Sequence, residues 1–173
     1  MTPQRHPGLG DRVHAGVLLF GIAGVICAYW IAFFLTDLTK PDFAHAAAGP
    51  ALAPLVAVYM GFESAFPLAD GFVAITAAIA ALYLWAGDPK AVLFGLVSGG
   101  GLLFLALIDI YFNVLHGFYT PAMLAADSGM QIEAVINVGC VGVAIWSIWR
   151  LWRHTGRKVG WDEAVPPKPP GPC

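Results

Sequence analysis

Long apolar stretches without charged residues constrain the fold of this chain more than any other feature. The clearest is residues 91–108, which contain no charged side chain. A helix needs roughly 20 apolar residues to cross a hydrocarbon core of about 30 Å, so such a stretch favours a transmembrane helix. Only 12% of the residues are charged, too few to cover the surface of a soluble domain of 173 residues. The sequence therefore predicts an all-α integral membrane protein.

We expect a four-transmembrane-helix bundle that forms one domain over residues 13–153. The first apolar stretch is longer than the apolar region of a secretion signal, which favours a retained span. Residues 1–12 are expected to be a cytoplasmic N-terminal segment, and the proline-rich residues 154–173 a disordered cytoplasmic tail. The predicted spans are residues 13–35, 68–86, 91–116 and 129–153.

Residues 44–66 are also apolar, but the distribution of basic residues argues against a fifth crossing. Lys and Arg occur near the N-terminus, at Lys40, at Lys90 and near the C-terminus, whereas residues 115–131 contain none. Four spans place all of these basic groups except Lys40 on one side, which the positive-inside tendency identifies as the cytoplasm. We therefore expect residues 44–66 to form an additional interfacial or re-entrant helical segment on the outer side. The charge pattern predicts a bacterial inner- or plasma-membrane type of protein with both termini cytoplasmic.

A polar stripe near the end of the third predicted span is the main sign of a functional site. Asp109, Asn113 and His116 are four and three residues apart, a spacing that places them on one face of a helix. Ionisable groups inside a span are costly in lipid, and they commonly mark ligand, ion or proton sites. Asp109 is expected to face the bundle interior and to have a polar partner on the second or fourth span.

Further polar residues fall at a similar depth on the other predicted helices. Glu133 and Asn137 are four residues apart and share a face of the fourth span. Asp70 begins the second span on the outer side, and Glu63 lies just before that span. The predicted ligand-binding residues are therefore Glu63, Asp70, Asp109, Asn113, His116, Glu133 and Asn137.

Several kinds of chemistry suit this group. It can bind the polar or cationic end of a small or lipid-like, otherwise hydrophobic ligand, with acid–base chemistry at Asp109 and Glu133. It can hold a divalent cation, the one cofactor that the sequence suggests, through Asp70, Asp109, His116 and Glu133. It can share protons between neighbouring carboxylates. In the simplest alternative, the polar groups only satisfy one another inside the membrane.

Other classes of protein fit the sequence poorly. A net charge of −2, without an interleaved basic and aromatic surface, argues against nucleic acid as a partner. The predicted spans contain no lysine that could form a Schiff base with retinal. The expected partners are the lipid bilayer and a small molecule. The main rival is an accessory subunit of a larger membrane complex that uses glycine-rich helix faces, at Gly95, Gly99, Gly139 and Gly142.

Overall fold

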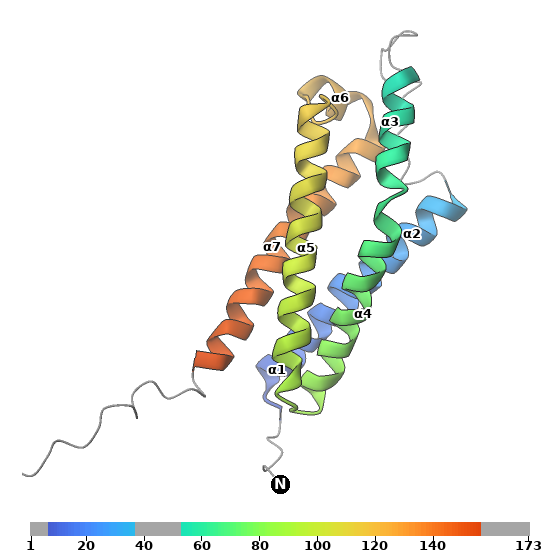
Figure 1. Cartoon of the computed structure of the whole chain (residues 1–173). Coiled ribbons are helices and arrows are strands. Elements are labelled where there is room, and N and C mark those ends of the chain that lie inside the picture. The colour runs from blue at the N-terminus through green and yellow to red at the C-terminus, as the bar shows by residue number, and fades with distance from the viewer. Residues whose placement is uncertain (1–6, 37–52, 157–173) are drawn as a thin grey trace, which may run out of the picture.

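The computed structural model describes residues 7–36 and 53–156, and this part of the chain is helical, without strands. Figure 1 shows the long helices side by side, with the short α6 at the end of the bundle opposite α1. The elements are α1 (Leu9–Gly16), the π-helix η1 (Val17–Gly24), α2 (Val25–Leu35), α3 (Ala53–Glu63), α4 (Phe66–Trp85), α5 (Lys90–Leu115), α6 (Pro121–Ala126) and α7 (Ser128–Gly156).

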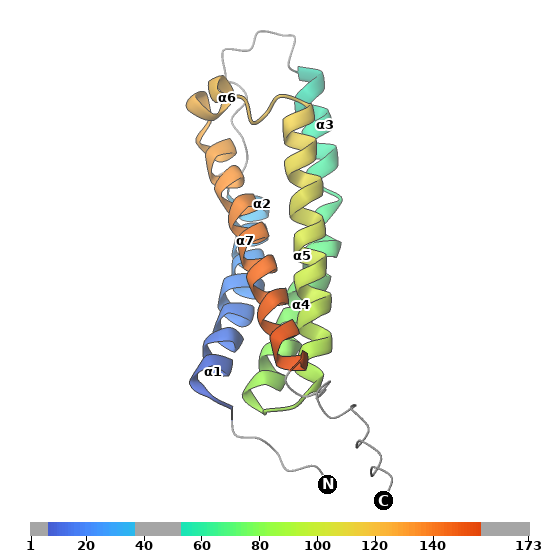
Figure 2. The same ribbon diagram turned by 90° about the vertical axis from the view of Figure 1, so that its left-hand side faces the viewer.

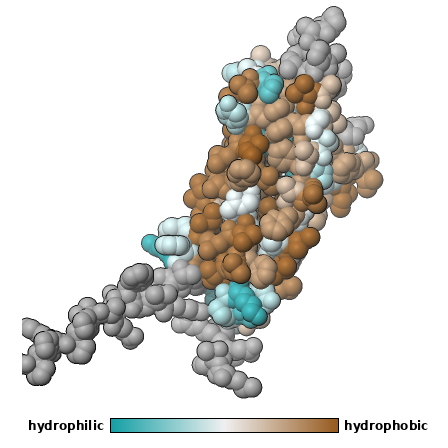
Figure 3. Space-filling model, in the orientation of Figure 1, coloured by the Kyte–Doolittle hydropathy of each residue, from teal (hydrophilic) through white to brown (hydrophobic). Residues whose placement is uncertain are grey.

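Four helical stretches are long and apolar enough to cross a membrane. They are Leu9–Leu35, Val56–Trp85, Lys90–Leu115 and Ser128–Arg153. On the face shown in Figure 3, mostly apolar residues cover the middle of the molecule and hydrophilic residues lie toward its ends. The prediction of an all-helical protein with four such helices is confirmed.

The second candidate span includes α3 as well as α4. The two helices are separated at Ser64 and Ala65, and Figure 1 shows them stacked nearly end to end. Val56–Trp85 has 30 residues and would be about 45 Å long at 1.5 Å per residue, more than a hydrocarbon core of about 30 Å. That residues 44–66 do not cross the membrane stays a prediction, and residues 44–52 lie outside the described part of the chain.

Small side chains allow α4 to lie close to both of its main neighbours. It packs on one side against the N-terminal helix, which consists of α1, η1 and α2, and on the other against α5. Without large side chains between them, helices can approach closely and gain van der Waals contact. The buried residues of α4 are Val73, Ala74, Thr76, Ala77, Ala80, Ala81 and Leu84.

Two glycines of α5 are required by its contact with α7. A Cβ atom on Gly95 would clash with Leu151 Cδ1, and one on Gly99 would lie 2.9 Å from Ile148 Cγ1. These two glycines therefore contact α7 of the same chain rather than a partner subunit. Gly139 and Gly142 on α7 have nothing within 4 Å of such a Cβ, and their contact with a partner subunit stays a prediction.

The remaining side of the bundle, between the N-terminal helix and α7, is packed less closely. At the α1 end, His14 Nε2 and Ser147 Oγ form a buried hydrogen bond of 2.7 Å, and the His14 ring contacts Trp146. Beyond this point, neither η1 nor α2 packs closely on α7. Figure 2 shows this side of the molecule, with α7 beside the N-terminal helix.

Local signals at the helix ends agree with the structure. Gly87 has a φ of 67°, and Asp88 Oδ1 accepts a hydrogen bond from the Lys90 amide, as the Gly-Asp-Pro sequence between α4 and α5 favours for a tight turn. Asp127 Oδ1 accepts hydrogen bonds from the amides of Gly129 and Met130, as expected of a helix cap. Among the described residues, Lys and Arg occur only at the α1 end of the bundle, as Arg12, Lys90, Arg150 and Arg153.

Candidate functional site: a carboxylate-lined pocket

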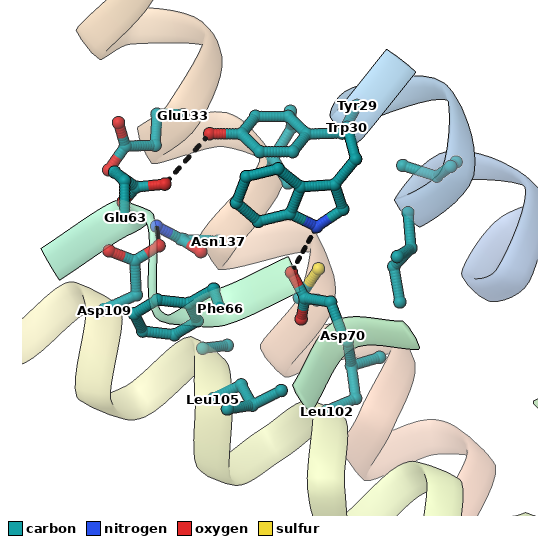
Figure 4. Close-up of a pocket in the computed structure, with 15 residues that line it drawn as sticks. Tyr29, Trp30, Glu63, Phe66, Asp70, Leu102, Leu105, Asp109, Glu133 and Asn137 are labelled. Atoms are coloured by element: carbon teal, nitrogen blue, oxygen red, sulfur yellow. Dashed lines mark hydrogen bonds between the residues drawn. The ribbon is translucent and has the colours of Figure 1, made fainter. Parts of the chain in front are cut away.

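Three carboxylates from three helices meet between α3, α5 and α7. Glu63 ends α3, Asp109 lies in the second half of α5, and Glu133 lies in the second turn of α7. Each contributes one carboxylate oxygen to a group in which the atoms lie within 4.8 Å of one another. Glu63 and Glu133 are each only 3% exposed. Figure 4 shows the three side chains converging.

Asp109 is held by two asparagines. Asn113 Nδ2, one turn along α5, donates a hydrogen bond of 2.8 Å to Asp109 Oδ1. Asn137 Nδ2 on α7 donates one of 2.8 Å to Asp109 Oδ2. The expectation that Asp109 has a polar partner on the fourth span is therefore confirmed.

Glu133 accepts hydrogen bonds from an amide and from two phenols. Asn113 Nδ2 lies 2.7 Å from Glu133 Oε1, and the Tyr59 hydroxyl donates to Glu133 Oε2. Tyr119 donates to Glu133 Oε1 at 3.4 Å and accepts a hydrogen bond of 2.8 Å from Asn137. Burial, together with the nearby Glu133 carboxylate, raises the pKa of Tyr119, so its phenol stays protonated and can donate.

Glu63 and Asp70 contact aromatic residues of α2. The Tyr29 hydroxyl donates to Glu63 Oε2 at 3.4 Å, and Trp30 Nε1 donates to Asp70 Oδ2 at 2.8 Å. Figure 4 shows Asp70 apart from the other three carboxylates, on the far side of Trp30 and Phe66. Asp70 therefore belongs to the same pocket but not to the three-carboxylate group.

His116 lies away from this group. Its Nδ1 atom is 2.9 Å from the Phe112 carbonyl oxygen, and its ring packs against Phe112 and Phe118. Of the residues predicted to bind a metal, Asp109 and Glu133 are brought together with Glu63, whereas Asp70 and His116 are not part of that group.

A cavity of about 60 Å³ adjoins the carboxylates. None of the described residues that line it is Lys, Arg or His, so its carboxylates face only neutral hydrogen-bond donors. Asn113 Oδ1, which is buried, has no hydrogen-bond partner in the described part of the chain, so acceptors exceed donors here. The lining residues are Val25, Ile26, Tyr29, Trp30, Glu63, Phe66, Asp70, Leu102, Leu105, Ala106, Asp109, Glu133, Ile136, Asn137 and Cys140.

The aromatic members of the site were not among the residues predicted from the sequence. Tyr59 lies four residues before Glu63, a spacing that places both on one face of α3 and that could have identified it. Tyr29 and Trp30 lie within the first span, where an aromatic residue is usually a packing residue. Tyr119 lies in a connection, where no periodicity indicates which way a side chain points.

The chain was also compared with known proteins. No protein-family model, no curated protein and no solved structure matches it. Its function therefore has to be inferred from the pocket.

Proposed function

We propose that this chain is an integral membrane protein whose pocket binds the cationic head of a small, lipid-like molecule. The observation that carries the proposal is the group of Glu63, Asp109 and Glu133, whose oxygens lie within 4.8 Å of one another, with no basic residue among the described residues of the pocket lining. Like charges at this separation repel strongly in a medium of low dielectric constant. A bound cation offsets that repulsion.

The remaining lining suits an organic cation. An ammonium group supplies further hydrogen-bond donors to a cluster in which acceptors outnumber donors, and the aromatic faces of Tyr29, Trp30 and Phe66 can attract its positive charge. Asp70 places another carboxylate in the same cavity. A predominantly apolar lining with a few convergent polar groups is typical of small-molecule sites.

We further propose an orientation. The described Lys and Arg residues lie at the α1 end, so the positive-inside tendency places that end and both termini in the cytoplasm of a bacterial inner- or plasma-membrane type of protein. The pocket then lies in the outer half of the bilayer, and the beginning of α3 extends beyond the hydrocarbon core.

In a cysteine-free background, a membrane-impermeant thiol reagent should label Ala125→Cys in intact cells but not Lys90→Cys. The reverse pattern would contradict this orientation.

Ligand binding can be tested with benzylamine as the probe and benzyl alcohol as its neutral counterpart. Calorimetry on the purified chain in detergent should detect the amine but not the alcohol. Glu133→Gln should weaken amine binding at least tenfold. Asp88→Asn is the control, because it removes a carboxylate at the other end of the bundle and keeps an acceptor for the Lys90 amide. Equal binding of amine and alcohol, or an unchanged affinity in Glu133→Gln, would reject the proposal.

A divalent cation is the second candidate for the same atoms. Oxygens that coordinate one Ca²⁺ lie about 2.3–2.6 Å from it, so two of them are at most about 5 Å apart. The three carboxylate oxygens, within 4.8 Å of one another, meet this condition. Stabilisation by Ca²⁺ or Mn²⁺ but not by benzylamine, lost in Glu63→Gln, would favour the metal over the amine.

A further inference from the structure

A second cavity lies beside the carboxylate-lined pocket. It has a volume of about 190 Å³ and is lined by apolar residues and one cysteine. Several residues line both cavities, so the two cavities are direct neighbours. The shared residues are Val25, Ile26, Leu102, Ile136 and Cys140, and the second cavity is completed by Gly21, Ile22, Gly139 and Val143.

Two glycines help to keep the second cavity open. It lies where η1 and α7 face each other without packing closely. Among the described residues, a Cβ atom on Gly139 would meet nothing within 4 Å, and one on Gly21 would meet only Val17 Cγ1, at 3.5 Å. Larger residues at these two positions would project into or beside the space.

The opening of the second cavity lies on the apolar side of the bundle. Gly21 and Gly139 are exposed, and Val25, which lines both cavities, is 42% exposed. All three positions belong to helices that are long and apolar enough to span a membrane, and they lie within these helices rather than at their ends. A molecule dissolved in the hydrocarbon could therefore enter sideways, between η1 and α7.

The size of the second cavity is sufficient for an apolar group. An apolar cavity of about 150 Å³ in another protein holds benzene. A space of about 190 Å³ therefore has room for a ring or a short alkyl chain. Each methylene buried there should raise affinity roughly threefold to fourfold, from about 0.8 kcal/mol per CH₂.

We infer that the ligand is an amphiphilic amine that enters from the bilayer. Its ammonium head binds among Glu63, Asp109 and Glu133, and its apolar body occupies the second cavity between η1 and α7. This inference rests on the proposed function, because the head-group site is the same pocket. It adds the chemical class of the body and the route of entry.

The test compares ethylamine with hexylamine on the purified full-length chain in detergent. Gly139→Leu should fill the second cavity, weakening hexylamine binding at least tenfold while leaving ethylamine within twofold. Gly142→Leu is the matched control, because Gly142 also lies on α7 with open space around it but does not line the cavity. Each affinity is expressed as the ratio of variant to wild type for the same amine. The partition of that amine into micelles is the same for both proteins and does not affect the ratio.

A second variant and Glu133→Gln complete the test. Val143→Phe enters the same cavity from one turn further along α7, and it should repeat the selective loss of hexylamine if Gly139→Leu fails to fold. If both cavity variants bind hexylamine like wild type while Glu133→Gln loses both amines, the inference is overturned and the proposed function stands. If amine binding does not depend on Glu133, both are overturned.

Discussion

The two ends of this bundle are held together by different means. At the α1 end, Gly95 and Gly99 bring α5 against α7 so closely that a methyl group would clash with Leu151 or Ile148. At the α6 end, the space between the same two helices is crossed by Asn113, Asn137 and the carboxylates that they bind. One end depends on apolar side chains packed against glycines, and the other on polar side chains that bridge the two helices.

This difference explains why the carboxylate-lined pocket forms toward the α6 end. Close contact between helices leaves no space for a ligand, and small residues suit it. Polar side chains that bridge a wider gap leave space around them. The hydrogen bonds between these side chains can also be replaced by hydrogen bonds to a ligand. A hydrophobic cluster of Tyr59, Phe118 and Met130 also packs at the α6 end. The comparison therefore predicts that substitutions at the α1 end mainly affect stability, whereas those at the α6 end affect binding as well.

The largest loss of stability is expected for Gly99→Leu. Its side chain would collide with Ile148, and an overpacked core typically loses 1–3 kcal/mol, so we expect about 3 kcal/mol here. Gly100→Leu is the control, since the neighbouring glycine is exposed and has nothing within 4 Å. Unfolding in mixed micelles measures both. Equal stability of the two variants would show that the α1 end is not closely packed.

Asn113→Leu should have the next largest effect. Asn113 is fully buried and donates to both Asp109 and Glu133, so its loss leaves two carboxylates short of a donor. We expect a cost of about 2 kcal/mol, within the range for unsatisfied buried groups. Tyr111→Phe, on the exposed side of the same helix, should be close to neutral in the same unfolding assay. A neutral Asn113→Leu would mean that the polar network contributes little.

The features that could be predicted from the sequence are those that local patterns determine. Hydropathy and length identify the long helices, and the spacing of Asp109 and Asn113 places both on one face of α5. Asp127 is identified as a helix cap by its position before an apolar run. Each of these depends on residues a few positions apart, so no knowledge of the tertiary structure is needed.

The features that could not be predicted depend on how the helices are rotated about their axes. Depth along a span suggested that Asp70 belongs with Asp109 and Glu133, but the rotation of α4 directs Asp70 to Trp30 instead. The sequence does not show whether Gly95 faces α7 or another subunit, because glycine has no side chain whose chemistry would indicate what it packs against. The π-helical turns of η1 have no reliable local signal, and they form one wall of the second cavity.

A smaller effect is expected for Ser147→Ala at the α1 end. It removes the buried hydrogen bond to His14, and a typical hydrogen bond contributes about 1 kcal/mol. Ser64→Ala, whose hydroxyl is exposed and bonds only within its own turn, serves as the control for losing a serine hydroxyl. Benzylamine affinity should be unchanged in both variants. A change in affinity in Ser147→Ala would show that the two ends are coupled.

The smallest change in stability is expected for Asp109→Asn. The substitution keeps the shape of the side chain but loses one of the acceptors that Asn113 and Asn137 use, at a cost of about 1 kcal/mol. It also removes a negative charge from a group that includes Glu63 and Glu133, and the relief of repulsion offsets that cost.

Asp109→Leu separates the two contributions. Leucine also removes the charge but leaves both asparagine amides without their acceptor, so it should cost roughly 1–3 kcal/mol. Both variants should lose benzylamine binding, while only Asp109→Leu should unfold at a clearly lower denaturant concentration. If Asp109→Asn proved as destabilising as Asp109→Leu, the carboxylate would be needed to hold α5 and α7 together. The stability of the α6 end would then depend on its internal contacts as much as that of the α1 end does. Ligand binding would no longer be needed to explain the negative charge of Asp109.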